Sequence, residues 1–256
     1  MQSQRKENHV LDQTSLKLDH RYYASVYSQH GEDGYIAEIF RRIGTTNRRF
    51  VEIGVEQGLE CNTRFLLECG WTGVWIDGNS ELLTRAKNTF GDFVASGSLK
   101  IVDCFLTPDN VNNVVKSAIG DCSVDFLSID TDQHTHHIWS ALHLPSRVAC
   151  LEYNSTLPMN VAIEVPYMAD AAWDGTNYFG ASLKSLEQKG LLKNMSLVGC
   201  ESMGVNAFFV DSQLVHDKFS YPYTAENHFV PPGYGNYKDH RCVGWPPGPA
   251  KKWIAS

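Results

Sequence analysis

Acidic residues and glycines stand at the ends of several short apolar segments of this chain, and they are the first candidates for chemistry. The segment that begins at Arg49 carries Glu52 near its end and runs into Gly54 and Gly58. A second apolar segment stops at Asp77. Glycine lets a backbone approach a ligand closely, and an acid at a strand end can accept hydrogen bonds from ribose hydroxyls. The order of strand, glycine turn, helix, strand and acid predicts a nucleotide-binding α/β unit.

The spacing of these glycines differs from that of dinucleotide-binding proteins. From Glu52 onward the chain reads Glu-x-Gly-x-x-x-Gly instead of GxGxxG. The acid therefore lies inside the end of the first strand, directly before the turn. This arrangement points away from dinucleotides.

Apolar segments that alternate with helical patterns must position these residues. The expected strands cover 50–54, 73–77, 100–103, 123–130 and 148–154, and the expected helices cover 35–43, 61–69, 81–90, 108–119 and a segment from 138. This alternation predicts an α/β fold with a doubly wound, Rossmann-like and mostly parallel sheet. Two further apolar segments, 196–200 and 205–210, flank a short turn and predict a C-terminal antiparallel hairpin, which completes a seven-stranded sheet.

The chain divides into three expected parts. Residues 1–24 form an N-terminal arm, residues 25–211 form one ligand-binding domain, and residues 212–256 form a tail that packs on this domain. Within the domain, residues 155–179 form a long loop rich in aromatic side chains. A loop of this length is usually functional or disordered, and its aromatic content favours a wall of the substrate site.

Composition excludes several classes of protein. The net charge of −7 argues against non-specific binding to nucleic acid, which requires a basic face. No apolar run reaches 18 residues, and the polar N-terminus has no hydrophobic signal region, so we expect neither a membrane protein nor a secreted one. Seven cysteines without a CxxC pair predict reduced thiols in a cytoplasmic protein. Oligomerisation stays open.

The ordered set of motifs resembles the S-adenosylmethionine-dependent methyltransferase superfamily, and more narrowly its FkbM-like group. The matching stretches are SQHGEDGYI, FVEIGVEQGLECNTRFLLECGWTGVWIDG, VDFLSID, LEYN and YFGASLKSLEQKG, which span roughly residues 27–210. The resemblance implies a transferase that uses S-adenosyl-L-methionine and acts on a small molecule in biosynthesis. A sulfonium cation is favourable beside acidic strand ends, whereas a pyrophosphate would be repelled there.

The resemblance also implies roles for individual residues. Those that would contact the cofactor are Glu52, Gly54, Gly58, Asp77, Gly78, Asp103, Cys104 and Asp130. The first acid and the two turn glycines would line the methionine and ribose, and Asp77 would bind the ribose hydroxyls, with Gly78 along the adenine. Asp103 and Cys104 would flank the adenine ring, and Asp130 would lie between the sulfonium and the substrate.

The segment from Ser128 to His137 departs from the usual pattern of the group because it contains three histidines. Asp130 and Asp132 share one face of an extended segment, and Glu152 and Asn154 share one face at the end of the neighbouring strand. Carboxylate and amide oxygens from adjacent strand ends are ligands for a hard divalent cation such as Mg²⁺. We therefore expect a metal set of Asp130, Asp132 and Asn154.

The histidines leave three interpretations open. A subset of His134, His136 and His137 could shift the metal set towards a transition metal. Without a metal, His134 or His136 could act with Asp130 as a catalytic group, taking a proton from a substrate hydroxyl or amine. The histidines could also simply flank the next helix and contact solvent.

A second open question concerns the segment before the helix at 35–43. Its residues could form no more than a helix cap, or Gln29, Glu32 or Asp33 could fold over the ligand at the first strand.

The function implied by these observations is an O- or N-methyltransferase that uses S-adenosylmethionine on a small molecule, with or without metal assistance. Two alternatives stay open. The chain could use the same cofactor for non-methyl chemistry, such as cyclisation or aminocarboxypropyl transfer. It could also be a non-catalytic relative that binds a ligand in the same pocket.

Overall fold

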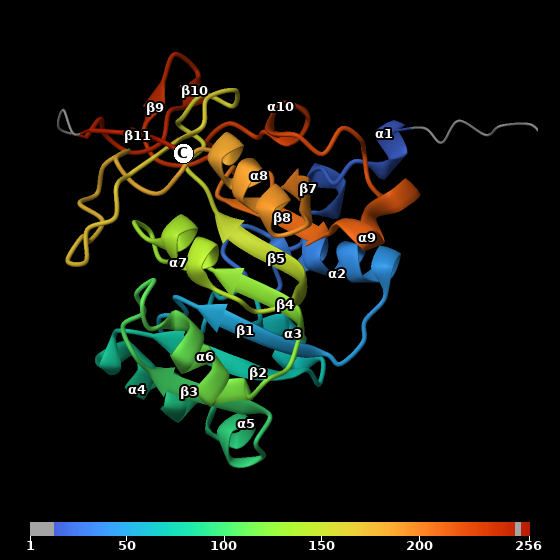
Figure 1. The fold of residues 1–256 in the computed structure, drawn as a ribbon, viewed down its shortest axis with the longest axis vertical. Helices are drawn as coiled ribbons and strands as arrows, with labels where there is room; N and C mark the ends of the chain where they lie inside the picture. Colours follow the sequence, from blue (N-terminus) through green and yellow to red (C-terminus); the bar gives the residue numbers. More distant parts are fainter. Residues whose placement is uncertain (1–12, 249–251) are drawn as a thin grey trace, which may run out of the picture.

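The fold is built on one seven-stranded sheet, described by a computed structural model that covers residues 13–248 and 252–256 (Figure 1). The strand order is β3-β2-β1-β4-β5-β8-β7. The strands are β1 (Arg49–Ile53), β2 (Thr72–Asp77), β3 (Leu99–Asp103), β4 (Val124–Ile129), β5 (Ser146–Glu152), β7 (Met195–Cys200) and β8 (Asn206–Asp211). Strand β8 runs antiparallel to both of its neighbours, and every other pair is parallel. The predicted fold, a mostly parallel seven-stranded sheet with an antiparallel hairpin, is confirmed.

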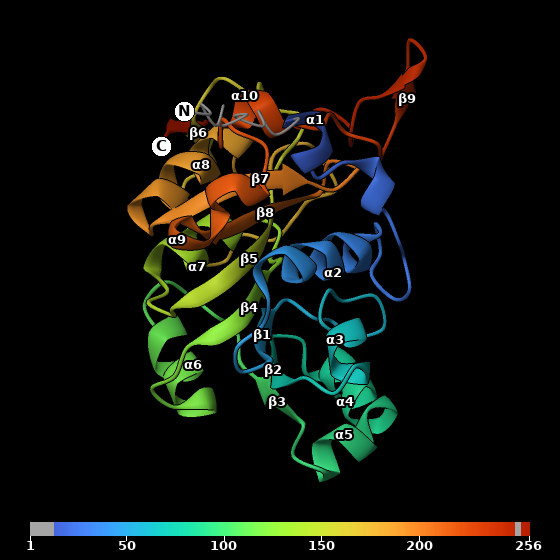
Figure 2. The same ribbon diagram turned by 90° about the vertical axis from the view of Figure 1, so that its right-hand side faces the viewer.

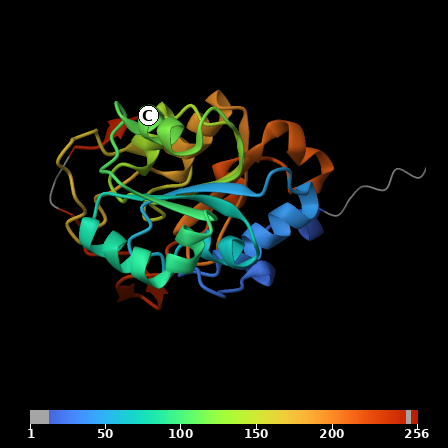
Figure 3. The same cartoon turned by 90° about the horizontal axis from the view of Figure 1, so that it is seen from below.

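Helices cover both faces of the sheet, as Figure 2 shows. One layer contains α2 (Glu32–Ile43), α3 (Arg64–Glu68), α4 (Ser80–Thr89) and α5 (Gly91–Ala95). The other contains α6 (Val111–Ile119), α7 (Thr135–Ala141) and α8 (Leu183–Leu192). Seen from below, the strands lie between these layers (Figure 3). Shorter helices are α1 (Gln13–Leu16), η1 (His20–Tyr22), α9 (Ser212–Val215), η2 (His216–Lys218) and α10 (Ala225–His228).

Side chains of the central strands alternate between two hydrophobic cores. In β4, Leu127 and Ile129 pack in the core that includes residues of α6, α7 and α8, whereas Phe126 packs with residues of α2, α3 and α4. Phe50 of β1 joins the second core and Val51 the first. Successive residues of a strand point to opposite faces, so a strand buried on both sides must be apolar throughout.

The carboxyl ends of the central strands are locked side by side. The backbone N–H of Asp130 donates to the carbonyl of Ile53 at 3.0 Å, and that of Gly54 donates to the carbonyl of Ile76 at 2.9 Å. The strand order reverses between β1 and β4, and ligand crevices of open α/β sheets form at such a reversal.

The long loop over residues 155–179 contains one short strand. Strand β6 (Ile163–Glu164) pairs antiparallel with β11 (Ile254–Ala255), and β9 (Tyr237–Lys238) pairs with β10 (Arg241–Cys242). Figure 1 shows β9, β10 and β11 close to this loop. Segments distant in the sequence therefore meet at one end of the sheet.

Some predicted boundaries differ from those observed. Helix α7 begins at Thr135 rather than at 138, and α3 occupies only Arg64–Glu68 of the expected 61–69. Of the expected arm 1–24, residues 1–12 lie outside the described residues. In the remainder, Leu18 is buried and forms a bridge with Gly199.

All seven cysteines are free, and Cys61, Cys150 and Cys200 are buried. In the part of the chain that the structure describes, no helix has the length and apolar character needed to cross a membrane.

Candidate active site

A cavity of about 900 Å³ opens at the carboxyl ends of β1, β2, β4 and β5. Its volume lies at the upper end of the range for small-molecule sites. Most of the residues expected to contact a cofactor line it, namely Glu52, Gly54, Gly58, Asp77, Gly78, Cys104 and Asp130. The exception is Asp103, which pairs in register with Asp77 on the neighbouring strand but is exposed and is not among the lining residues.

Glu52 holds the loop that forms the floor of this cavity. Its carboxylate accepts hydrogen bonds from the backbone N–H groups of Asn62 and Thr63 at 2.8 and 2.9 Å, and from the Thr63 hydroxyl at 2.5 Å. Burial raises the pKa of this carboxyl group. These bonds make Glu52 the anchor of the loop, in addition to its place in the cavity lining.

Both turn glycines are required by close approach as well as by backbone conformation. Gly54 has φ of 82°, and a Cβ atom there would lie 1.6 Å from the carbonyl oxygen of Asp130. Gly58 has φ of 75°, and a Cβ there would lie 2.4 Å from the ring of Trp75. These are conformations that side-chain-bearing residues rarely adopt. The Glu-x-Gly-x-x-x-Gly motif is thus a packing requirement of the cavity floor.

Asp77 joins two parts of the cavity wall. One carboxylate oxygen accepts from the backbone N–H of Glu56 and the other from that of Asn79, each at 2.8 Å. Asn79 in turn caps α4 by accepting from the N–H of Leu82. Each carboxylate oxygen has two lone pairs, so Asp77 keeps acceptor capacity for a hydroxyl in the cavity.

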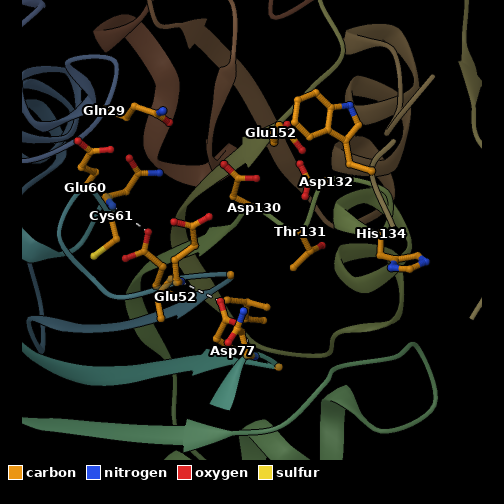
Figure 4. A pocket seen from close by; sticks show the side chains of 18 of the residues that line it. Gln29, Glu52, Glu60, Cys61, Asp77, Asp130, Thr131, Asp132, His134 and Glu152 are labelled. Atoms are coloured by element: carbon orange, nitrogen blue, oxygen red, sulfur yellow. Dashed lines mark hydrogen bonds between the residues drawn. The ribbon is translucent and has the colours of Figure 1, made fainter. Parts of the chain in front are cut away.

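Three carboxylates meet at the centre of the cavity. Oxygens of Asp130, Asp132 and Glu152 lie within 4.8 Å of one another, and Figure 4 shows all three side chains facing the same space. Burial, followed by the charges of Asp132, Glu32 and Glu52, raises the pKa of Asp130 to about 7. The pKa of Glu152 is raised well above its ordinary value by burial and then by Asp130 and Asp132. One oxygen of Glu152 is buried with no hydrogen-bond partner among the described residues.

The charge of the cavity has one sign. Its acidic lining residues are Glu32, Glu52, Glu56, Glu60, Asp77, Asp130, Asp132 and Glu152, and no described residue that lines it is lysine or arginine. Carboxylates held this close together need protons or a cation between them. The cavity therefore favours cationic groups and disfavours phosphate.

The first turn of α2 and the segment before it contribute to both of the roles that the sequence left open. Glu32 lines the cavity, where it accepts from Asn206 Nδ2 at 2.8 Å and from the backbone N–H of His30 at 2.9 Å. Asp33 instead accepts from three backbone N–H groups, those of residues 26–28, and stabilises the turn. Gln29 also lines the cavity.

Aromatic side chains from distant segments close the cavity. Trp173 and Phe179 come from the long loop, and Tyr234 and Trp245 come from the segment after β8. The rings of Trp173 and Trp245 contact each other at a centroid distance of 5.1 Å. The aromatic content of 155–179 indicated a wall of this kind. The tail after residue 211 was expected to pack on the domain or cover the site, but no local pattern indicated which of its residues would complete the wall.

The expected metal set needs a correction at Asn154. Its Nδ2 donates to the carbonyls of Asn177 and Phe179, each at 2.9 Å, and its Oδ1 accepts from the backbone N–H and hydroxyl of Thr156. Every polar atom of Asn154 is thus used within the scaffold. Strand β5 ends at Glu152, so the alternation of side chains does not continue to residue 154, and Glu152 takes the place beside the two aspartates.

The histidines also lie differently from the expected arrangement. His134 lines the cavity, but its Nε2 is bonded to the carbonyl of Met168 at 2.9 Å, and Figure 4 shows its ring directed away from Asp130 and Asp132. His136 does not line the cavity and is bonded to the carbonyl of Val165. Burial and then the neighbouring His137 lower the pKa of His136 to about 3. The expected catalytic role of His136 is corrected because helix α7 begins at residue 135 and turns its side chain away.

Comparison with known proteins adds a description of similar folds. No family model matches the chain, and no curated protein matches it either. The solved structure of SAH-bound Podospora anserina methyltransferase PaMTH1 is 13% identical, with a TM-score of 0.46, and the alignment covers 72% of this chain and 79% of that one. The glycopeptide N-methyltransferase MtfA, complexed with S-adenosyl-L-homocysteine, is 9% identical, with a TM-score of 0.43 and coverage of 75% and 91%.

A third structure, that of the pyocyanin biosynthetic protein PhzM, is 11% identical, with a TM-score of 0.39 and coverage of 68% of this chain. The chain spans 53% of the length of PhzM, about half. Likenesses this distant carry no argument about the reaction. The function is therefore inferred from the residues of the cavity.

Proposed function

We propose that this protein is an S-adenosylmethionine-dependent methyltransferase that acts on an amine or hydroxyl of a small molecule. The FkbM-like group is the subgroup that we propose, on the sequence stretches given above. The observation that carries the proposal is the acid-lined cavity, free of lysine and arginine among its described lining residues, at the reversal point between β1 and β4.

The residues fit the proposed cofactor. The glycine turn provides a close backbone approach that a Cβ would block, Asp77 keeps acceptor capacity for ribose hydroxyls, and Phe105 lies against Gly78 beside the cavity. When bound, S-adenosylmethionine supplies a methyl group activated by a positively charged sulfur. The carboxylates of Asp130 and Glu152 favour a positive charge at this place, and the nucleotide phosphates of other adenosine compounds would be repelled.

The residues that face the acceptor can orient it and remove its proton. With a pKa of about 7, Asp130 is divided between its charged and neutral forms near neutral pH, which suits a general base. The aromatic wall of Trp173, Phe179 and Tyr234 can exclude water and stack on an apolar or cationic body. The one-sided charge favours an amine over an acceptor that carries a phosphate or carboxylate.

One observation favours a metal-assisted variant of this function. Three carboxylates within 4.8 Å of one another are hard oxygen ligands of the kind that Mg²⁺ or Mn²⁺ binds. A divalent cation held there would lower the pKa of an acceptor hydroxyl. Turnover that is abolished by EDTA and restored by Mg²⁺ would favour this variant. Turnover that EDTA does not change would favour Asp130 as a general base without a metal.

Isothermal titration with S-adenosylmethionine and S-adenosylhomocysteine tests the proposal. We expect both to bind, and ATP, which has the same adenosine but a triphosphate, to bind far more weakly. Turnover with a library of amines should release S-adenosylhomocysteine, detected by mass spectrometry. If neither compound binds, the proposal is overturned. Release of methylthioadenosine would favour non-methyl chemistry instead.

A further inference from the structure

A second group of ligand-type side chains lies outside the cavity. It consists of His136 and His137 of α7 and Glu164 of β6. One nitrogen or oxygen atom from each residue lies within 4.8 Å of the others. None of the three is among the residues that line the cavity. The proposed methyltransferase function makes no use of them.

The two imidazoles converge on one point. Nε2 of His136 lies 3.2 Å and Nε2 of His137 lies 3.0 Å from the same carbonyl oxygen, that of Val165. The ring centroids are 3.9 Å apart. With Nε2 of His136 bonded to the carbonyl, its Nδ1 is a buried nitrogen without a hydrogen-bond partner among the described residues. His136 is 1% exposed, so this nitrogen cannot be satisfied by bulk water.

Two neighbouring side chains fix the position of the Glu164 carboxylate. Its Oε2 accepts from the hydroxyl of Ser185 at 2.7 Å and forms an ion pair with Lys189 at 2.9 Å. Carboxylates that ligate metals are commonly oriented by such outer hydrogen bonds. The Glu164 side chain is also mostly buried, whereas His137 is partly exposed and leaves a path from solvent.

We propose that His136, His137 and Glu164 bind a divalent transition metal ion, with Zn²⁺ as the best candidate. Two imidazoles and one carboxylate are a recurring zinc set, and a carbonyl oxygen or water can complete four-coordination. Imidazole nitrogen disfavours Mg²⁺ and Ca²⁺, which prefer all-oxygen sites. Because α7 follows the Asp130 loop and β6 belongs to the loop that walls the cavity, the ion would tie these two segments together.

The proposal is tested with the whole chain, dialysed against EDTA and titrated with Zn²⁺ by calorimetry. We expect one ion per chain at this site, and X-ray absorption at the zinc edge with nitrogen and oxygen neighbours at about 2.0–2.1 Å. His137→Ala and Glu164→Gln should each weaken binding by about tenfold or more. His143→Ala is the matched control, because His143 lies just after α7 and is exposed, and it should leave the affinity unchanged.

The readouts do not involve S-adenosylmethionine, so the outcome is separate from that of the proposed function. Sulfur neighbours at the zinc edge would overturn the proposal by pointing to cysteines. Loss of binding in Asp132→Asn but not in His137→Ala would also overturn it, by moving the ion into the cavity. If the variants do not fold, the absorption spectrum of the unaltered protein still shows whether the ligands of the ion are nitrogen and oxygen atoms. Any other set of ligands would contradict the proposal.

Discussion

Thr63 binds the carboxylate of Glu52 twice, through its backbone N–H at 2.9 Å and its hydroxyl at 2.5 Å. The same hydroxyl accepts from the indole N–H of Trp75 at 2.7 Å, which ties β2 to this pair. An acid that resembles a ligand contact in the sequence is therefore the anchor of a loop. For the proposed function, the fit of the cofactor would depend on that anchor through the shape of the turn.

Replacement of Glu52 by Gln tests this role. The NH₂ group of the amide is a donor and would face backbone N–H groups, which are also donors. We therefore expect the free energy of unfolding to fall by about 1.5–3 kcal/mol. The affinity for S-adenosylhomocysteine should fall with it, because the turn loses its support. Urea unfolding and calorimetry measure the two effects. Glu60→Gln is the control, since Glu60 lines the same cavity but is exposed, and equal effects in both variants would contradict the anchor role.

The turn glycines can be tested by separating close approach from backbone strain. Gly54→Ala combines a positive φ with a collision against Asp130, whereas Gly70→Ala has φ of 81° with open space around it. We expect Gly70→Ala to lower stability by about 1 kcal/mol without changing affinity for S-adenosylhomocysteine. Gly54→Ala should abolish detectable binding. Equal affinities in the two variants would show that close approach at residue 54 is not required.

Asp77 and Asp103 form a matched pair, since they end adjacent strands in register but only Asp77 lines the cavity. Loss of a charge-assisted hydrogen bond should weaken binding of S-adenosylhomocysteine to Asp77→Asn by about tenfold or more. Asp103→Asn should bind like the unaltered protein. A larger loss in Asp103→Asn, measured by calorimetry, would restore the cofactor role predicted for it from the sequence.

The pH dependence of turnover should report Asp130. A general base with a pKa of about 7 requires the rate to rise as pH increases through that value. Asp130→Asn should reduce the rate by about 100-fold or more and remove this dependence. Asp132→Asn should move the profile to lower pH, because the charge of Asp132 raises the pKa of Asp130. A profile that stays in place in Asp132→Asn would argue against this assignment.

The same shift has a consequence for stability without ligand. Asp130 has a pKa of about 7 in the folded protein and 3.8 as its ordinary value, so between these values the folded state binds more protons. Its contribution to stability is therefore present at low pH and is lost as pH rises towards 7. Asp130→Asn should melt a few degrees higher than the unaltered protein at pH 8, and the gap should shrink at pH 5. Calorimetric melting curves at both values check the sign, and a gap that widens at pH 5 would reverse it.

Local patterns were enough to predict the sheet and the positions of its acidic ends. The strands that end near Glu52, Asp77 and Asp130 can be recognised from their own sequences. A strand that is buried on both faces must be apolar at nearly every position. The placements of Asn154 and His136 could not be predicted in the same way. Each lies one or two residues beyond a change from strand to turn or from turn to helix, where the periodicity that assigns a face no longer holds.

The remaining part of the cavity depends on contacts that have no local pattern. Trp245 reaches Trp173 across a long stretch of chain, and Tyr234 bonds to Ser155. An aromatic-rich loop predicts that a wall exists but not which distant residues complete it. The position of Glu32 has the same cause, since its partner Asn206 belongs to the last strand of the sheet.

The pairing of β6 with β11 implies an order in which parts of this fold form during translation. Strand β6 forms a bridge with the nearby Ala181, but its pairing with Ile254 and Ala255 must wait until those residues leave the ribosome. Tyr178, the neighbour of Phe179 in the cavity wall, also waits, because its hydroxyl donates to the carbonyl of Lys252. The central sheet can form during translation, but the support behind this part of the cavity wall is completed only when these late residues have emerged. A nascent chain would thus form the floor of the cavity before its wall is fully supported.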